Sequence, residues 1–313
     1  MTIPNNISDG FSASKSGGNN KEIKFTKIPD KEYMSLLEKG ASETVFKLPA
    51  SVTRKDHVPI ACPDGKFELQ ADIYYKDTQK SQARPCIIFM HDWAAGKNPD
   101  LCGDRQGCFF ALNGFVFIAL YYRPPKYSPC PAALEDLKTA ARWVRSKAQE
   151  YSIAADKIIA MGSSAGSQWA FMGATTNGDE SFEAPCGFNE FSSEINLVML
   201  HAAICNVVKD FKDTEMMQIL FNCTYEQKPD RYMEFSPVCN VRKGMPPVII
   251  INGDCDQGCS IEAARELRDK LDAVGGVVEL VELPGRDHGS TGFPGDLFLK
   301  LNKYKDFIQA NWS

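Results

Sequence analysis

The sequence predicts an α/β fold in which helices cover both faces of a mostly parallel central sheet. Continuous apolar runs rich in β-branched residues, typical of buried strands, alternate along the chain with segments of helical periodicity. Such alternation is typical of parallel sheets whose strands are joined by helices. Near the amino end, the turn sequence at residues 63–66 separates two extended runs, which predicts an antiparallel hairpin at one edge of the sheet.

The elements are expected in the following order. Residues 1–25 are polar and rich in Asn, Ser and Gly, and we expect them to be disordered. A short helix is expected at 28–37, with Asp30 as its cap, followed by the hairpin at 58–75. Buried strands are expected at 85–90, 114–123, 157–161, 196–201, 247–252 and 277–283, and helical segments at 109–113, 131–151, 167–172, 260–274 and 296–311.

Residues 26–313 are expected to form a single domain with one insertion. The irregular stretch at about 203–245 is too long for a simple loop and contains a short helical pattern at 213–221. It follows the strand that ends at His201, and ligand sites in α/β sheets lie beyond the carboxyl ends of the strands. We therefore expect the insertion to form a small cap over the site.

Charge and hydropathy argue against several classes of protein. The chain has 35 Lys and Arg against 40 Asp and Glu, a net charge of −5, with no long basic run, so neither nucleic acid nor an anionic membrane is an expected partner. No apolar stretch reaches the roughly 18 residues of a membrane span. The amino end lacks the apolar core of a signal peptide, which favours the cytoplasm, with secretion as the alternative if the natural chain begins elsewhere.

Eleven cysteines are dispersed along the chain, and their odd number leaves at least one unpaired. They do not form repeated C-x-x-C pairs, and with only four His residues no zinc site is expected. We expect mostly free thiols that behave as small apolar groups. The alternative is a local bridge, for which Cys205–Cys223, Cys223–Cys239 and Cys102–Cys108 are the candidates.

A G-x-S-x-G motif at residues 162–166 follows the strand at 157–161 and precedes a helical segment. Small residues on both sides of Ser164 remove the side chains that would clash in a very tight strand-to-helix turn. Such a turn holds the serine in a strained conformation, with its hydroxyl exposed above the end of the sheet. The alternative is a glycine-rich loop with a helix-capping serine, or an anion-binding loop.

An activated serine needs a base to take its proton and an acid to orient that base. Of the two histidines downstream of the motif, His201 ends a strand in the expected core and is expected to be structural. His288 lies in a loop before the last helix and is the expected base. Asp256 projects from the loop after the strand expected at 247–252 and is the expected acid. Asp254, expected to bond its own backbone as a turn-former, is the alternative, and Asp287 is a third choice.

The oxyanion of an acyl-transfer reaction needs two backbone N–H donors. Ala165, directly after the serine, is one expected donor. The other is expected from the loop at 91–96, with Trp93 as the first choice and Asp92 as the alternative.

Substrate contacts are expected from aromatic and apolar side chains near this edge of the sheet. Trp93, Tyr121 and Tyr122 follow strands that end there and could stack on an aromatic acyl group or a sugar, or could belong to the core. Met217, in the short helix of the insertion, is a further candidate, with a place in the core of the cap as its alternative.

These segments resemble the α/β-hydrolase superfamily, and within it the acetyl-xylan esterase and feruloyl esterase-like carboxylesterases. The resemblance covers about residues 55–312. The family's His-Gly-Gly-Gly-x-Trp oxyanion loop is here His91-Asp92-Trp93-Ala94-Ala95-Gly96, with fewer glycines. The resemblance is carried by residues 91–96, 114–123, 131–140, 155–166, 236–238, 246–247, 253–256 and 285–289.

The resemblance implies that Ser164 is the nucleophile, Asp256 the acid and His288 the base of a serine esterase that needs no cofactor. It further implies acetyl or feruloyl esters of plant polysaccharide as substrates. A broad short-chain carboxylesterase is the alternative. A peptidase of the same fold is less favoured, and a non-catalytic binding protein that retains the hydrolase fold is the candidate from another class.

Overall fold

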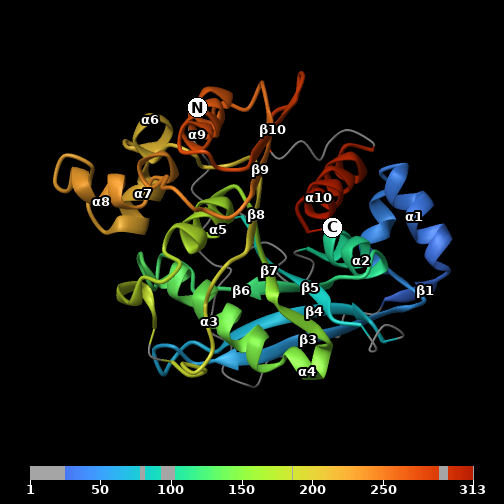
Figure 1. Cartoon of the computed structure of the whole chain (residues 1–313). Coiled ribbons are helices and arrows are strands. Elements are labelled where there is room, and N and C mark those ends of the chain that lie inside the picture. Colours follow the sequence, from blue (N-terminus) through green and yellow to red (C-terminus); the bar gives the residue numbers. More distant parts are fainter. Residues whose placement is uncertain (1–24, 78–81, 93–102, 185, 289–294, 313) are drawn as a thin grey trace.

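The computed structural model describes residues 25–77, 82–92, 103–184, 186–288 and 295–312. Their main feature is an eight-stranded sheet in the order β10-β9-β8-β7-β5-β6-β4-β3 (Figure 1). The strands are parallel except at one edge, where β4 runs antiparallel to both β6 and β3. The mostly parallel sheet with an antiparallel edge hairpin is therefore confirmed. A separate parallel pair, β1 (Thr26–Ile28) and β2 (Lys47–Pro49), was not predicted.

The predicted strands and the larger predicted helices are present, with small shifts at their ends. The strands of the main sheet are β3 (Val52–Ala61), β4 (Leu69–Lys76), β5 (Arg84–Met90), β6 (Val116–Tyr121), β7 (Ile153–Ser163), β8 (Leu197–His201), β9 (Val248–Gly253) and β10 (Val278–Leu283). The helices are α1 (Asp30–Glu38), α2 (Asp104–Leu112), α3 (Ala132–Ser146), α4 (Ala148–Tyr151), α5 (Ala165–Thr175), α6 (Val207–Phe211), α7 (Glu215–Phe221), α8 (Pro229–Glu234), α9 (Ile261–Ala273) and α10 (Asp296–Trp312), with short 3-10 turns η1 (Ser42–Phe46), η5 (Glu180–Phe182) and η6 (Pro237–Cys239).

The sheet is buried on both faces, which explains why its central strands are continuously apolar. In β5, Ile88 and Met90 pack into the core beneath α3, α5 and α9, whereas Ile87 and Phe89 pack into the core beneath α1, α2 and α10. Figure 1 shows these two groups of helices on opposite sides of the sheet. The alternation follows from the two-residue period of a strand.

Two helix starts differ from the predictions because tertiary contacts, rather than local pattern, fix them. Helix α2 begins at Asp104, earlier than expected, and the Asp104 carboxylate receives a hydrogen bond from Arg54 at 2.9 Å. Asp30 does not cap α1; its carboxylate instead accepts hydrogen bonds from the backbone N–H and the hydroxyl of Ser51. In addition, the helix expected at 131–151 is divided at Lys147 into α3 and α4.

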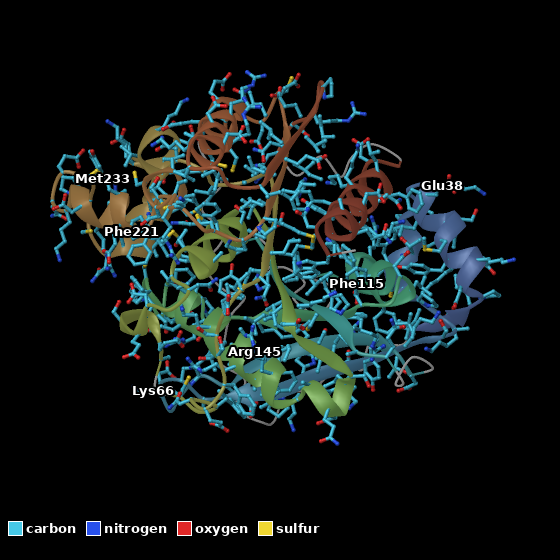
Figure 2. The ribbon with its side chains drawn as sticks, viewed as in Figure 1. Glu38, Lys66, Phe115, Arg145, Phe221 and Met233 are labelled. Carbon is cyan, nitrogen blue, oxygen red and sulfur yellow. The ribbon has the colours of Figure 1, made fainter. Side chains whose placement is uncertain are left out.

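The inserted stretch folds into α6, α7, α8 and η6 and packs on α5. Phe235 lies 6.2 Å from Trp169 between ring centres, and Gln168 donates to the Phe235 carbonyl at 2.8 Å. Figure 2 shows Phe221 and Met233 in this segment, far across the molecule from Glu38 of α1. That the segment acts as a cap over the site remains a prediction.

The ten cysteines within the described residues are free thiols, as expected for most of them, so the Cys205–Cys223 and Cys223–Cys239 bridges are not formed there. Cys102, the partner in the third candidate bridge, lies outside the described residues, as do residues 1–24 of the segment expected to be disordered. Within the described part of the chain, no helix is both long and apolar enough to cross a membrane.

Candidate active site

Ser164 occupies the tight turn between β7 and α5. Its backbone has φ 50° and ψ −119°, a strained combination for a residue with a side chain. The Ser164 N–H donates to the carbonyl of His201 at the end of the neighbouring strand β8, at 3.0 Å. The strain is thus held in place by the sheet, and the serine is presented at its carboxyl edge.

The two glycines of the motif are required by close backbone contacts. A Cβ at position 162 would lie 2.3 Å from the carbonyl oxygen of Gly166, and a Cβ at position 166 would lie 2.0 Å from that of Met90. Both distances are far inside van der Waals contact. The predicted strand-to-helix turn is therefore present, and its first helical turn rests directly on the end of β5.

The structure brings the three predicted triad residues together at the ends of β7, β9 and β10. His288 Nε2 lies 3.1 Å from Ser164 Oγ, and His288 Nδ1 lies 2.8 Å from Asp256 Oδ2. The other carboxylate oxygen of Asp256 accepts hydrogen bonds from the N–H groups of Gly258 and Cys259, each at 2.8 Å. These hydrogen bonds fix the orientation of the Asp256 carboxylate toward the His288 imidazole.

The contact between Asp256 and His288 shifts their pKa values in opposite directions. The hydrogen bond that His288 donates to Asp256 raises the pKa of His288 above its ordinary value of 6.5, although partial burial opposes the shift. Burial alone would raise the pKa of Asp256, but the hydrogen bonds from His288 and from the Cys259 N–H outweigh it and hold the pKa below 3.8. At neutral pH the acid is therefore ionised and faces a histidine whose protonated form it stabilises.

Asp254 ties the two loops together and does not act as the turn-former that was predicted. Its carboxylate accepts a hydrogen bond from the N–H of Gly285 at 2.6 Å, rather than from the backbone of its own turn. The Cys255 N–H donates to the Arg286 carbonyl at 2.9 Å, and a Cβ on Gly253 would lie 2.1 Å from that same oxygen. Asp287 is exposed, as expected.

The candidate oxyanion donors are described only in part. Ala165 is the first residue of α5, so its N–H belongs to the free amino end of that helix. Trp93 lies outside the described residues. Asp92 is half-buried beside His91, whose Nδ1 contacts the Asp92 carbonyl oxygen at 2.7 Å. The choice between Trp93 and Asp92 stays a prediction.

The candidate substrate contacts Tyr121, Tyr122 and Met217 have partners within the protein. The Tyr121 hydroxyl donates to Asp72 at 2.7 Å. The Tyr122 hydroxyl donates to the His91 carbonyl at 2.9 Å, and its ring stacks on the His91 ring at 4.7 Å. Met217 is 1% exposed within the core, which leaves it no surface for a substrate. Tyr122 thus contacts His91 directly after β5, a contact that the sequence reasoning missed.

Sequence reasoning also missed Lys300, which is 2% exposed and places its ammonium 2.9 Å from His201 Nε2. A signal was available, because Lys300 shares the apolar face of α10 with Tyr304 and Phe307, at spacings of four and seven residues. A lysine on such a face is buried, and a buried charge needs a specific partner.

Asp256, Cys259 and His288 also meet the loose geometric condition for a metal site, since one donor atom of each lies within 4.8 Å of the others. An ion there would have to displace the direct hydrogen bond between Asp256 and His288. Burial also raises the pKa of the Cys259 thiol well above 9, which disfavours the thiolate that a metal would bind.

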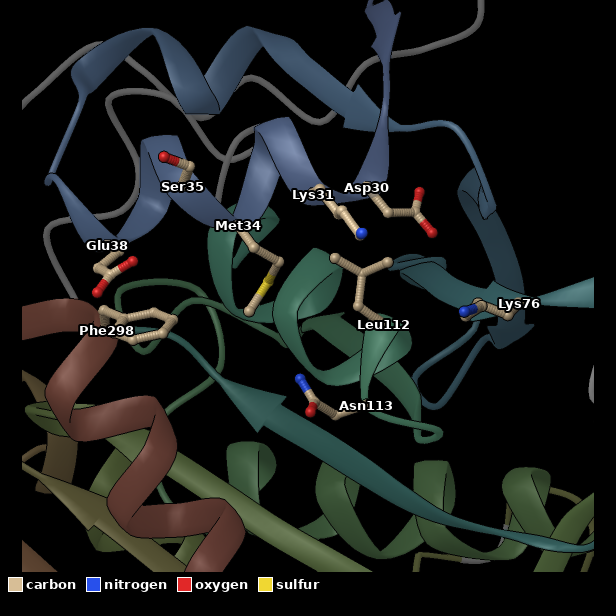
Figure 3. Close-up of a pocket in the computed structure, with 9 residues that line it drawn as sticks. All are labelled: Asp30, Lys31, Met34, Ser35, Glu38, Lys76, Leu112, Asn113 and Phe298. Carbon is tan, nitrogen blue, oxygen red and sulfur yellow. The ribbon is translucent and has the colours of Figure 1, made fainter.

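One groove of about 430 Å³ lies between α1, α2 and α10. Figure 3 shows Met34, Leu112 and Phe298 around it, with Asp30 and Lys76 toward one end. None of the predicted site residues lines this groove. It is therefore separate from the Ser164 site.

Residues 71–271 match the BD-FAE family, a segment that includes Ser164 and Asp256. Among curated proteins, the esterase LipC of Mycobacterium tuberculosis is 23% identical over 231 residues, which is 70% of this chain and 56% of LipC. The probable carboxylic ester hydrolase LipM of the same organism is 26% identical over 182 residues, 56% of this chain and 42% of LipM. The chain thus spans about half the length of the curated relatives it matches.

Solved structures agree with the fold. A truncated carbohydrate esterase from gut microbiota superposes with a TM-score of 0.74 at 22% identity, covering 83% of this chain and 96% of that one; at this identity the likeness concerns the fold alone. Esterase 2 of Thermogutta terrifontis bound to butyrate superposes with a TM-score of 0.68 at 26% identity, covering 81% and 94%. The same enzyme phosphoramylated by tabun gives a TM-score of 0.69 at 25% identity, covering 83% and 94%. The family match extends over more than half of the chain, and the chain therefore belongs to the BD-FAE family of α/β-hydrolase-fold esterases.

Proposed function

We propose that the protein is a serine carboxylic-ester hydrolase that acts through an acyl-enzyme. The observation that carries the proposal is the continuous chain of hydrogen bonds from Ser164 through His288 to Asp256, at 3.1 and 2.8 Å. Nucleophile, base and acid within hydrogen-bond reach are what this chemistry needs. Membership of the BD-FAE family supports the same activity.

In the first half-reaction, His288 Nε2 takes the Ser164 proton as Oγ attacks the carbonyl carbon of the ester. Asp256, buried and ionised, stabilises the imidazolium that forms. The negative charge on the carbonyl oxygen is received by the N–H of Ala165 and by a second N–H from the loop after β5, at Asp92 or Trp93. The alcohol then leaves with the proton held by His288.

In the second half-reaction, water replaces the alcohol. His288 takes a proton from the water, the hydroxide attacks the acyl carbon, and the proton returns to Ser164 as the acid leaves. No step in this scheme requires a metal or an organic cofactor.

For the substrate, we propose small acyl esters, with acetyl or feruloyl groups on plant polysaccharide as the first choice. The resemblance to acetyl-xylan and feruloyl esterase-like enzymes supports this choice. A short-chain carboxylesterase is the second candidate, because the Thermogutta terrifontis esterase 2 structures include butyrate and propionate complexes. The net charge of −5 disfavours nucleic acid as a partner.

The activity is tested by labelling the full chain with a fluorophosphonate probe and by hydrolysis of p-nitrophenyl acetate. We expect the label on Ser164 and no detectable turnover in Ser164→Ala. Ser192→Ala, an exposed serine of a surface loop, is the matched control and should behave as wild type. Absence of labelling in a folded protein would overturn the proposal in favour of a non-catalytic binding protein.

The substrate is tested by comparing kcat/KM for p-nitrophenyl acetate, p-nitrophenyl butyrate and methyl ferulate with acetate release from acetylated xylan. We expect acetylated xylan or methyl ferulate to be preferred. Preference for p-nitrophenyl butyrate, with no release from xylan, would favour the short-chain carboxylesterase.

A further inference from the structure

A second histidine, His201, contacts the turn that carries Ser164. His201 ends β8 and pairs in register with Ser163 of β7. Its carbonyl accepts the Ser164 N–H at 3.0 Å, and its Nδ1 lies 3.4 Å from Ser163 Oγ. The next residue, Ala202, is itself strained, with φ 43°. His201 therefore contacts the strained turn through both its backbone and its side chain.

The other side of the His201 ring meets a buried lysine. Lys300 Nζ lies 2.9 Å from His201 Nε2, and the two residues are 2% and 8% exposed. Burial lowers the pKa of Lys300 to about 8 and that of His201 well below 6.5, so at neutral pH an ammonium faces a neutral imidazole. Because an ammonium can only donate, Nε2 must accept, and the imidazole proton must reside on Nδ1, which faces Ser163.

Helix α10, which carries Lys300, is fastened to both sides of the candidate triad. Tyr304 donates to the carbonyl of Leu200 in β8 at 2.8 Å. Asp296, at the start of the helix, accepts a hydrogen bond from Arg286 Nε at 2.5 Å. Arg286 lies two residues before His288. One helix thus contacts both β8 and the loop that carries His288.

Burying a lysine ammonium costs free energy, which a hydrogen bond to a neutral imidazole offsets only in part. Replacing buried ionic groups with apolar ones of similar volume is often neutral or stabilising. The Lys300–His201 contact instead fixes the His201 ring. Only one tautomer and one orientation of that ring satisfy both Lys300 and Ser163. Such support matters at a nucleophile, where a small misplacement reduces the rate far more than it reduces binding.

We infer that Lys300 and His201 are positioning residues for Ser164: Lys300 fixes the tautomer and the orientation of the His201 ring, and His201 holds the Ser163–Ser164 turn. The inference rests on the proposed esterase activity and concerns residues that do not touch the substrate.

The test compares Lys300→Met, which removes the donor, with Lys300→Gln, which keeps a donor without the charge. We expect Lys300→Met to lower kcat for p-nitrophenyl acetate about tenfold with KM within about twofold, and Lys300→Gln to lose less. Lys300→Met leaves the buried His201 Nε2 without its donor, so a lower Tm is expected in this variant than in Lys300→Gln, and circular dichroism checks that both are folded. Lys303→Met, on the exposed face of the same helix, is the matched control and should leave kcat unchanged.

A second readout does not depend on activity. The chain has only four histidines, so nitrogen-15 histidine spectra can assign each ring, with His201 identified by its loss in His201→Gln. We expect the Nδ1–H tautomer in wild type and its loss in Lys300→Met. The Nε2–H tautomer in wild type, or a wild-type kcat in Lys300→Met, would overturn the inference.

Two further outcomes are separable. If Lys300→Met does not fold, Ser163→Ala replaces it as the test. This variant keeps Lys300 paired with His201 but removes the hydroxyl that accepts from His201 Nδ1. A loss in kcat would support the inference, and an unchanged kcat would overturn it. If wild type is folded but does not react with the fluorophosphonate, the proposed esterase activity fails, while the tautomer remains measurable.

Discussion

His288 and His201 contact adjacent serines of the same turn and have opposite properties. The His288 side chain is 45% exposed, contacts Ser164 Oγ and faces the carboxylate of Asp256. His201 is buried, contacts Ser163 and faces the ammonium of Lys300. The pKa of the first is raised by its hydrogen bond to Asp256, and the pKa of the second is lowered by burial.

The two histidines share a residue type and a place at the sheet edge, so their partners and their exposure are what distinguish them. A general base must exchange protons with the reacting groups, so it needs access to them and a pKa near the working pH. A supporting ring must keep one protonation state and one tautomer, and burial beside a cation enforces both.

The largest expected effect follows from removing the accessible histidine. His288→Ala should lower kcat by on the order of 10⁴ to 10⁶, because Ser164 then has no base. Steady-state hydrolysis of p-nitrophenyl acetate measures this, with circular dichroism as the check on folding. A loss of less than tenfold would place the base elsewhere.

Replacing the acid should cost nearly as much. Asp256→Asn should lower kcat about 10⁴-fold, since an amide no longer stabilises the imidazolium or fixes the required tautomer. Asp254→Asn is the matched control in the same loop: it weakens the bond to the Gly285 N–H and should lower Tm while leaving most of kcat. The reverse ranking of the two variants in kcat would make Asp254 the acid.

Replacing the buried histidine should have a much smaller effect. His201→Gln should lower kcat about tenfold at nearly constant KM, because the turn keeps its backbone hydrogen bond but loses the ring that steadies it. Its pH profile should match that of wild type. A shifted acid limb in this variant would mean that His201 exchanges protons during turnover.

The smallest effect is a shift in pH dependence. His288 must be neutral to accept a proton, and Asp256 raises its pKa, so kcat/KM should fall on acidification with a midpoint above 6.5. In Asp256→Asn, the residual activity should show a midpoint moved toward 6.5 or below. An unmoved midpoint would show that Asp256 is not the main cause of the raised pKa.

The same shift has a consequence for stability. Because the pKa of His288 is raised in the folded protein, the pair with Asp256 stabilises the fold most below pH 6.5, and this contribution disappears as the pH rises through the folded-state pKa. The Tm difference between wild type and His288→Ala should therefore be larger at pH 5 than at pH 8.5.

Much of this architecture could be predicted because its signals are local. Strands buried on both faces, such as β5 and β9, read as continuous apolar runs, and the tight turn at Ser164 needs small neighbours that the sequence displays. The order of serine, aspartate and histidine then selected Asp256 and His288 for the positions that the structure brings together.

What could not be predicted depends on contacts between distant parts of the chain. Nothing local to Lys300 indicates that it reaches His201, 99 residues away, or that Tyr122 contacts the backbone of His91. The start of α2 was misplaced for the same reason, because the contact of Asp104 with Arg54 is tertiary. Asp254 was expected to bond within its own turn because a turn pattern carries no information about a neighbouring loop.

The contact between the loops that carry Asp256 and His288 bears on how the candidate triad can be altered. The Arg286 carbonyl leaves no room for a side chain at Gly253. The Asp254 carboxylate accepts a hydrogen bond from Gly285, and the Cys255 N–H donates one to the Arg286 carbonyl. The loops that carry Asp256 and His288 therefore form one structural unit. Grafting either loop alone from a relative should misalign Asp256 and His288, whereas exchanging residues 253–256 and 284–288 together should preserve their alignment.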